Sequence, residues 1–195
     1  IQERLEREFD LNLVTTAPSV SFRITEKNNM VREIHNPAQL PPPSEIQKIE
    51  EPIIEALILT PDRYLGGVLK LLESRRGEQK KMEYISAQRI FLKYVLPLNE
   101  VVFNFYNQLK SISQGYASMD YELAGFREAP LVKLDILINR EMVDALSLII
   151  HRDKAYQVGK ALVEKMRRII PRQQFEVFLQ AALGKRVIAR ETVKP

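Results

Sequence analysis

The segment Pro52–Gly77, PIIEALILTPDRYLGGVLKLLESRRG, joins an apolar run to an amphipathic one. The apolar part, PIIEALILT, is short and rich in branched residues, which predicts a buried strand. Thr60 and Pro61 are residue types that favour the start of a helix, and Gly77 is typical of a helix end. The segment therefore predicts a strand and then a helix, with one apolar helix face made of Leu65, Val68, Leu69 and Leu72.

The same pattern continues as far as residue 126. KKMEYIS and RIFLKYVLP predict two more strands, and the second places Ile90, Leu92, Tyr94 and Leu96 on one face before Pro97 ends it. LNEVVFNFYNQLKSISQG predicts one helix ending at Gly115, with an inner face of Val102, Phe105, Leu109 and Ile112. YASMDYEL predicts a last strand that alternates Ala117, Met119, Tyr121 and Leu123. The order βαββαβ indicates an α+β fold of the ferredoxin-like type, with two helices on one face of a four-stranded antiparallel sheet.

Shorter elements are expected before this unit. Residues 1–9 predict the end of a helix, 11–15 a strand, and Ala17–Ser19 a turn. Residues 19–24 and 30–35 predict a hairpin around the polar EKNN. The following stretch, NPAQLPPPSEIQKIEEP, holds five of the prolines of the chain and predicts a linker.

The last third predicts a second α+β unit. LVKLDILIN and MVDALSLII are expected strands, Asp153–Ile170 an expected helix, and QFEVFLQAAL and RVIARETV two final strands. On a helical wheel the helix has an apolar side made of Ala155, Val158, Leu162, Met166, Ile169 and Ile170.

Positive charge is concentrated in this last third. The whole chain has a net charge of +4, but residues 131–195 hold 13 Lys and Arg against 7 Asp and Glu, so the preceding residues are slightly negative. Such asymmetry suggests an anionic partner for this part of the chain. The candidate RNA-binding residues are Arg152, Lys154, Lys160, Arg167, Arg168, Arg172, Lys185, Arg186 and Arg190.

A solvated helix face is the competing interpretation. Lys and Arg are good helix formers, and cations such as Arg167 and Arg168 compensate the dipole at a helix C-terminus. The cations beyond Pro171 have no such role, which favours contact with phosphates. Because few aromatic residues are interleaved with them, recognition of a folded RNA by its shape fits better than base stacking.

No catalytic centre is visible. The chain has no cysteine and two histidines, which makes a metal site improbable. It contains no GxxxxGK[ST], GxGxxG or GxSxG motif, and no apolar run of the length that crosses a bilayer. His151, near Asp153, is expected to cap or pack at the helix start. Asp135 and Asp144 are expected in salt bridges or in solvent rather than as a catalytic pair.

Several long strings resemble one family closely. IQERLEREFDLNLVTTAPSV, LKSISQGYASMDYE, VDALSLIIHRDKA and IPRQQFEVFLQAALGKRVIARETVK are similar to the C-terminal half of LepA. This family comprises ribosome-associated translational GTPases, also called back-translocating elongation factors. The resemblance runs nearly end to end, and the related TypA family fits these strings less well. The resemblance to LepA implies that the chain is cut from a longer protein.

The resemblance implies a domain layout. Residues 1–36 would be the tail of a module like domain III of elongation factor G, 37–50 a Pro-rich linker, and 51–126 a ferredoxin-like domain V. Residues 127–195 would be a truncated LepA-type C-terminal domain.

The resemblance also implies a function. The full-length protein would be a ribosome-dependent GTPase that uses GTP and Mg²⁺ at a site outside this chain. The chain alone would be inactive and would bind no cofactor. Its implied partners are the ribosome, through rRNA and large-subunit proteins, and tRNA, which it would move back by one codon after faulty translocation. It would be cytoplasmic, form no stable oligomer, and associate peripherally with the inner membrane.

Three positions depart from the usual pattern of the family. Arg140 and Met142 stand where glycine and proline are expected, which puts the tightness of this turn in question, although Asn139 tolerates a left-handed backbone. Gln114 replaces an arginine that could face RNA. The alternative to the translation-factor interpretation is a ferredoxin-like regulatory module that binds a small molecule in an apolar pocket and needs no basic face.

Overall fold

The computed structural model describes residues 7–9 and 20–195. Residues 7–9 are helical, and the strand and turn expected at 11–19 lie outside the described residues. Contacts within the chain divide it into two units, Ile1–Val20 with Pro52–Gly125 and Ser21–Glu51 with Phe126–Pro195. Both units are α+β with antiparallel sheets, as the sequence predicts. The finer division into four segments stays a prediction.

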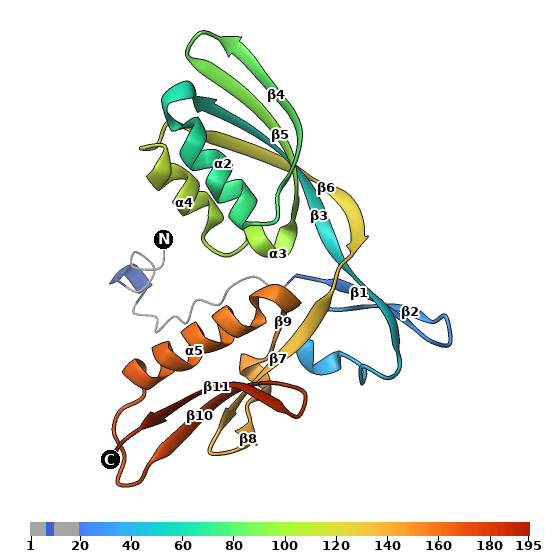
Figure 1. Cartoon of the computed structure of the whole chain (residues 1–195), viewed down its shortest axis with the longest axis vertical. Coiled ribbons are helices and arrows are strands. Elements are labelled where there is room, and N and C mark those ends of the chain that lie inside the picture. Colours follow the sequence, from blue (N-terminus) through green and yellow to red (C-terminus); the bar gives the residue numbers. More distant parts are fainter. Residues whose placement is uncertain (1–6, 10–19) are drawn as a thin grey trace. The chain divides into compact units, whose positions relative to one another are not determined.

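The first unit has the ferredoxin-like order. Its elements are β3 (Ile46–Pro61), α2 (Leu65–Ser74), β4 (Glu78–Ser86), β5 (Arg89–Pro97), α3 (Leu98–Val101), α4 (Phe105–Ile112) and β6 (Ser118–Glu128). Strand β3 pairs with both β5 and β6, and β5 pairs with β4, so the strands lie in the order β6-β3-β5-β4. Helices α2 and α4 cover one face of this sheet (Figure 1).

The helices and the sheet enclose one apolar core. The alternating residues of β5 are at most 6% exposed, which confirms the predicted inward face of Ile90, Leu92, Tyr94 and Leu96. Val68 and Leu72 from α2 and Phe105 and Leu109 from α4 are fully buried against them. Burial, and to a lesser degree the charge of Glu73, raises the pKa of Tyr94 above its ordinary value.

Both helices end in the same hydrogen-bonded motif. After α2, the Gly77 N–H donates to the Leu72 carbonyl at 2.8 Å and the Arg76 N–H to the Glu73 carbonyl at 3.1 Å. Arg76 has φ 57°, so a non-glycine residue occupies the left-handed position of a Schellman motif. Gln114 and Gly115 repeat this arrangement after α4. The predicted helix ends at the two glycines are therefore correct to within a few residues.

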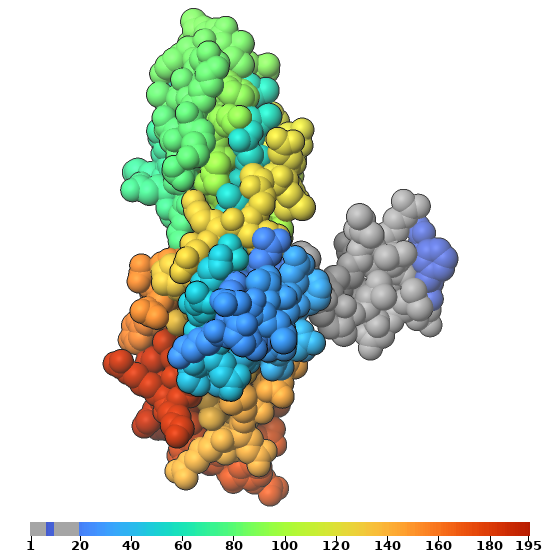
Figure 2. Space-filling view, turned by 90° about the vertical axis from the view of Figure 1, so that its right-hand side faces the viewer, coloured from blue at the N-terminus to red at the C-terminus, as the bar shows by residue number. Residues whose placement is uncertain are grey.

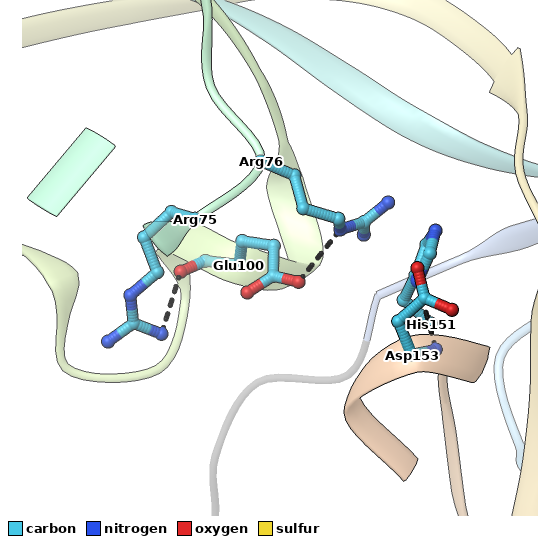
Figure 3. A network of polar contacts seen from close by, with 5 residues as sticks. All are labelled: Arg75, Arg76, Glu100, His151 and Asp153. Carbon is cyan, nitrogen blue, oxygen red and sulfur yellow. Dashed lines mark hydrogen bonds and ion pairs between the residues drawn. The ribbon is translucent and has the colours of Figure 1, made fainter. Parts of the chain in front are cut away.

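The arginine at the left-handed position has a side-chain partner. The Arg76 Nε donates to the buried Glu100 carboxylate at 3.0 Å (Figure 3). The neighbouring Arg75 donates to the Glu100 carbonyl at 3.4 Å and to the Gln108 side chain at 2.7 Å. These contacts tie the end of α2 to α3 and α4.

Gly77 is required by space, which a pair of substitutions would test. A Cβ at Gly77 would lie 2.7 Å from the Leu72 carbonyl oxygen and 2.9 Å from Leu96 Cδ2, whereas a Cβ at Gly66 would meet nothing within 4 Å. We expect Gly77→Ala to lower the free energy of unfolding by about 1–3 kcal/mol through overpacking. Gly66→Ala, inside α2, should raise it by about 0.5–1 kcal/mol. Urea denaturation followed by circular dichroism measures both, and a neutral Gly77→Ala would contradict the close packing.

Two predictions about helix boundaries in this unit are wrong. Thr60 is not a helix N-cap: it is 1% exposed and paired with Ile90, because β3 continues to Pro61. A 3-10 turn, Asp62–Tyr64, then leads into α2. The helix expected over 98–115 is broken, because Asn104 has φ 61° and separates α3 from α4. Val101 is therefore buried in place of the predicted Val102, and Ile112 is 37% exposed.

Strand β6 also departs from its predicted alternation. Ala117 is buried and Met119 packs on the core, but Tyr121 is 50% and Leu123 70% exposed. The strand pairs only with β3 and is therefore at the edge of the sheet.

The second unit begins with a β-hairpin whose strands belong to the same sheet as β3. The predicted hairpin is confirmed as β1 (Phe22–Glu26) and β2 (Val31–Ile34), and β1 also pairs with the first residues of β3. The expected linker contains a 3-10 turn, Pro37–Gln39, and the start of β3. The segment from β1 to β3 forms one block of surface, blue to cyan in Figure 2.

The remainder of the second unit is a sheet covered by one helix. Its elements are β7 (Leu131–Ile138), β8 (Glu141–Met142), β9 (Leu148–His151), α5 (Ala155–Ile169), β10 (Val177–Leu183) and β11 (Arg186–Val193). The order is β11-β10-β7-β8, with β9 also pairing with β7. The strand predicted over 142–150 is interrupted by a 3-10 turn, Asp144–Leu146.

Helix α5 lies along one face of this sheet (Figure 1). Its predicted inner face is largely confirmed, because Ala155 is buried and Val158, Leu162, Met166 and Ile170 pack on the core. Ala155, Gly159 and Val163 are buried, while Ile169 is 67% exposed. A Cβ at Gly159 would lie 3.0 Å from the Ala181 Cβ, so this glycine allows the helix to approach β10 closely. The prediction is wrong for Ile169 and omits Gly159 and Val163, because hydrophobicity counting gives a glycine no weight.

Candidate nucleic-acid interface

A cationic groove forms where α5 ends beside the end of β11. It encloses about 490 Å³, and its lining residues are Arg167, Arg168, Ile170, Pro171, Arg172, Thr192, Val193 and Lys194. Pairing of Val177 with Val193 brings the end of β11 next to the loop that follows α5. We call this feature the α5 groove. Three predicted cations therefore converge with a fourth, Lys194.

The cations of the α5 groove differ in their partners. The Arg167 Nη1 donates to the Glu191 carboxylate at 2.9 Å, and Arg167 is half exposed. Among the described residues, no carboxylate forms an ion pair with Arg168, Arg172 or Lys194. These three exposed side chains remain available to an anionic ligand.

The helix dipole accounts for only part of this charge. The C-terminus of a helix carries roughly half a negative elementary charge, which nearby cations offset. Arg167 and Arg168 are in the last turn of α5 and can serve this purpose. Arg172 lies beyond the helix and Lys194 on another strand, so they leave a positive surplus. A groove with surplus cations and open access is suited to phosphate groups.

The other predicted cations lie elsewhere on the second unit. Lys160 is on the exposed side of α5, 3.9 Å from Glu164. Arg152 and Lys154 precede the helix, and Lys185 and Arg186 are at the turn between β10 and β11. That turn is separated from the α5 groove by the length of β11, roughly 25 Å for a strand of its length.

Arg190 faces away from α5. Its neighbours in β11, Ala189 and Glu191, lie on the helix side of the sheet, as the contact between Glu191 and Arg167 shows. The nine candidates therefore do not form one surface: three line the α5 groove, and the others are distributed around the unit.

Two cations were missed by the sequence analysis. Lys194 belongs to no periodic pattern. The last two expected strands form a hairpin that turns near Gly184, and this hairpin places the end of the second strand, with Lys194, beside the start of the first strand. Arg140 was noted only as a departure from a family pattern. The structure places it near Phe178 and Arg190 on the open face of the sheet.

The titratable residues have structural roles. The His151 Nδ1 accepts a hydrogen bond from the Asp153 N–H at 3.3 Å, which caps the turn before α5 and confirms the prediction (Figure 3). The same nitrogen would have to be protonated to pair with the Asp153 carboxylate at 3.7 Å. Asp135 is buried and accepts from Ser147 Oγ at 2.9 Å and Lys133 Nζ at 3.2 Å, as expected of a salt-bridged strand residue.

Metal sites and membrane spans were sought over residues 7–9 and 20–195. No group of three or more His, Asp or Glu side chains in these ranges is arranged to hold a metal ion. No helix in the same part of the chain has the length and apolar character needed to span a membrane.

Known proteins resemble this chain over nearly its full length. The family model "Elongation factor G C-terminus" matches residues 48–137, and "GTP-binding protein LepA C-terminus" matches 138–195. The protein named Elongation factor 4 from Solibacter usitatus is 56% identical over 99% of this chain, and that from Acetivibrio thermocellus is 56% identical over 100%. The chain spans about a third of their length, 32% of each.

A solved structure from Thermus thermophilus matches more weakly. It covers 43% of this chain and 12% of its own, with 28% identity and a TM-score of 0.39. This score is too low to establish a shared arrangement.

Proposed function

Because this chain belongs to the LepA family of translation factors, whose curated members are called elongation factor 4, we propose that it is the part that contacts RNA on the ribosome. The observation that carries this proposal is the α5 groove, with three exposed cations that have no ion-pair partner among the described residues. Ribosomal RNA and tRNA both present the phosphates that such a groove would bind.

We propose that the α5 groove contacts tRNA and that the intact protein acts on tRNA position, favouring a one-codon backward step. The proposal rests on family membership together with the location of the free cations in the LepA-type part of the chain. Rows of cations without a stacking aromatic residue suit an RNA helix recognised by shape. Exposed charges at the edge of an interface chiefly govern the rate of association with the partner and its dependence on salt.

We propose that GTP hydrolysis takes place in a part of the intact protein outside this chain. The chain contains no phosphate-binding loop, and its described residues offer no metal-binding cluster for Mg²⁺. We propose that GTP and Mg²⁺ bind outside it and that the intact protein is a cytoplasmic, ribosome-dependent GTPase. Large-subunit proteins are proposed among its partners. Peripheral membrane association and the absence of a stable oligomer stay predictions.

Ribosome binding in a salt series tests this proposal. The chain should co-sediment with ribosomes at low salt and be released as salt rises, with each phosphate contact contributing about 0.7–0.9 to the slope of log affinity against log salt. A slope of at least about 2 is expected from the three free cations of the groove. Failure to co-sediment at low salt, or retention that is independent of salt, would contradict the proposal.

A further inference from the structure

The face of the second sheet opposite α5 carries a second cluster with a different composition. Val177, Leu179 and Ala181 of β10 point towards the helix and are at most 5% exposed, whereas Phe178 is 44% exposed. Strand alternation therefore directs Phe178 to the open face, where a cavity of about 300 Å³ forms. We call this cluster the sheet-face site. Its side chains from the open face are Arg140, Phe178, Gln180, Arg190 and Thr192.

Strand register fixes these side chains next to one another. Phe178 pairs directly with Thr192, and Gln180 with Arg190, so each pair is separated by roughly 5 Å between Cβ atoms. Leu137 lies on the other side of Gln180 and itself pairs with Met142, which is 51% exposed. The site therefore combines the exposed ring of Phe178 with an arginine one residue pair away along the strands.

A strained turn supplies the second arginine. Asn139 and Arg140 have φ of 52° and 71°, which makes a tight two-residue turn between β7 and β8. Asn139 is held to β10 by two hydrogen bonds: its N–H donates to the Phe178 carbonyl at 2.8 Å, and its side-chain oxygen accepts from the Phe178 N–H at 2.9 Å. The turn is therefore a tight two-residue turn although it contains no glycine. Its hydrogen bonds to Phe178 hold Arg140 near that residue.

The charge of the sheet-face site is not neutralised. Among the described residues, neither Arg140 nor Arg190 has an ion-pair partner. The nearby Glu191 directs its carboxylate to Arg167 on the opposite face. A non-glycine residue in the left-handed region costs stability, and such strain is concentrated at functional sites. An exposed aromatic ring that lines a cavity together with two arginines is the chemistry that binds an unstacked nucleotide.

We propose that the sheet-face site binds one unpaired nucleotide of a single-stranded or looped RNA. Its base stacks on Phe178, the flanking phosphates contact Arg140 and Arg190, and Gln180 and Thr192 form hydrogen bonds to the base edge. The volume of the cavity is at the lower end of the roughly 300–1,000 Å³ typical of small-ligand sites. The proposal rests on the proposed function in one respect, that the ligand is RNA. It does not depend on the α5 groove, which is on the other face of the sheet.

Binding of fluorescently labelled oligoadenylate to the whole chain tests the sheet-face site. Phe178→Ala should weaken binding by roughly 5- to 150-fold, the range for loss of one stacked base. Phe178→Tyr should retain binding, since the ring is kept. Neither change should alter binding to an RNA duplex of the same length. Equal losses on oligoadenylate and duplex, or no loss on either, would overturn the proposal.

Arg140→Gly separates a binding role from a structural one. Glycine adopts the left-handed backbone freely, so the thermal midpoint should rise by roughly 2–4 °C while oligoadenylate binding weakens. A gain in stability with unchanged binding would overturn the role of Arg140. Substitution of Arg168, Arg172 and Lys194 by glutamine serves as the independent test of the α5 groove. If that variant loses ribosome binding while Phe178→Ala keeps oligoadenylate binding, the sheet-face site is wrong and the proposed function stands.

Discussion

Replacing Phe105 by alanine is expected to lower the free energy of unfolding of the first unit by about 3–5 kcal/mol. Phe105 is fully buried, begins α4, and packs in the core with Leu109, Val68 and Leu72. Removing the ring deletes apolar contacts and leaves a cavity between the helices and the sheet. The chain has no tryptophan, so urea denaturation is followed by circular dichroism.

Leu69→Ala provides the matched comparison. Leu69 is on the side of α2 that packs on this core, but it is only half buried. Leu69→Ala should therefore lower the free energy of unfolding clearly less than Phe105→Ala. A loss below about 1 kcal/mol for Phe105→Ala would mean that the assigned face of α4 is wrong. Equal losses at both positions would show that the rim of the core is as tightly packed as its centre.

Substitution of Arg168, Arg172 and Lys194 by glutamine should have the largest effect on ribosome binding. If each contacts a phosphate, the slope of log affinity against log salt should flatten by about 2–3. The thermal midpoint should barely move, because these side chains are exposed and have no ion-pair partner among the described residues. Arg167 is left unchanged because its loss would also release Glu191.

A charge-matched variant controls for diffuse electrostatics. Arg152, Lys185 and Arg186 are exposed cations away from the α5 groove, and their replacement by glutamine removes the same charge. We expect a smaller change in slope for this control. Equal flattening by the two variants would indicate that net charge, and not the α5 groove, attracts the ribosome.

The strand pattern of the first unit could be predicted because each inward face is uniformly apolar. Ile90, Leu92, Tyr94 and Leu96 alternate without exception, and their burial follows directly. The start of α2 could not be predicted, because Thr60 and Pro61 have the residue types of a helix N-terminus but remain paired in β3. Tertiary pairing overrides a local capping preference of about 1 kcal/mol.

The break at Asn104 had a weak local signal. Asparagine tolerates the left-handed backbone, yet the apolar residues on both sides continue a helical spacing. The inner face of α5 was predicted without Gly159, because this glycine contributes no hydrophobicity although it lies close to β10. Contacts made by small residues cannot be read from hydrophobic periodicity.

The sequence predicts a cluster of cations in the last third of the chain but not where each cation lies. Charge asymmetry identified the last third of the chain, and the structure brings Arg167, Arg168 and Arg172 together at one groove. Lys185, Arg186 and Arg190 could not be separated from them, because sequence distance does not show which end or face of a sheet a residue occupies. That information resides in the pairing of β10 with β11.

Site-directed cross-linking tests the central claim most directly. The chain has no cysteine, so Arg172→Cys creates a single attachment point in the α5 groove for a photoreactive thiol reagent. Glu45→Cys, at an exposed acidic position of the second unit, serves as the control. In ribosome complexes carrying tRNA, the probe at position 172 is predicted to cross-link to RNA much more strongly than the probe at position 45. Cross-linking of RNA from position 45 but not from position 172, in complexes that still co-sediment, would contradict the account.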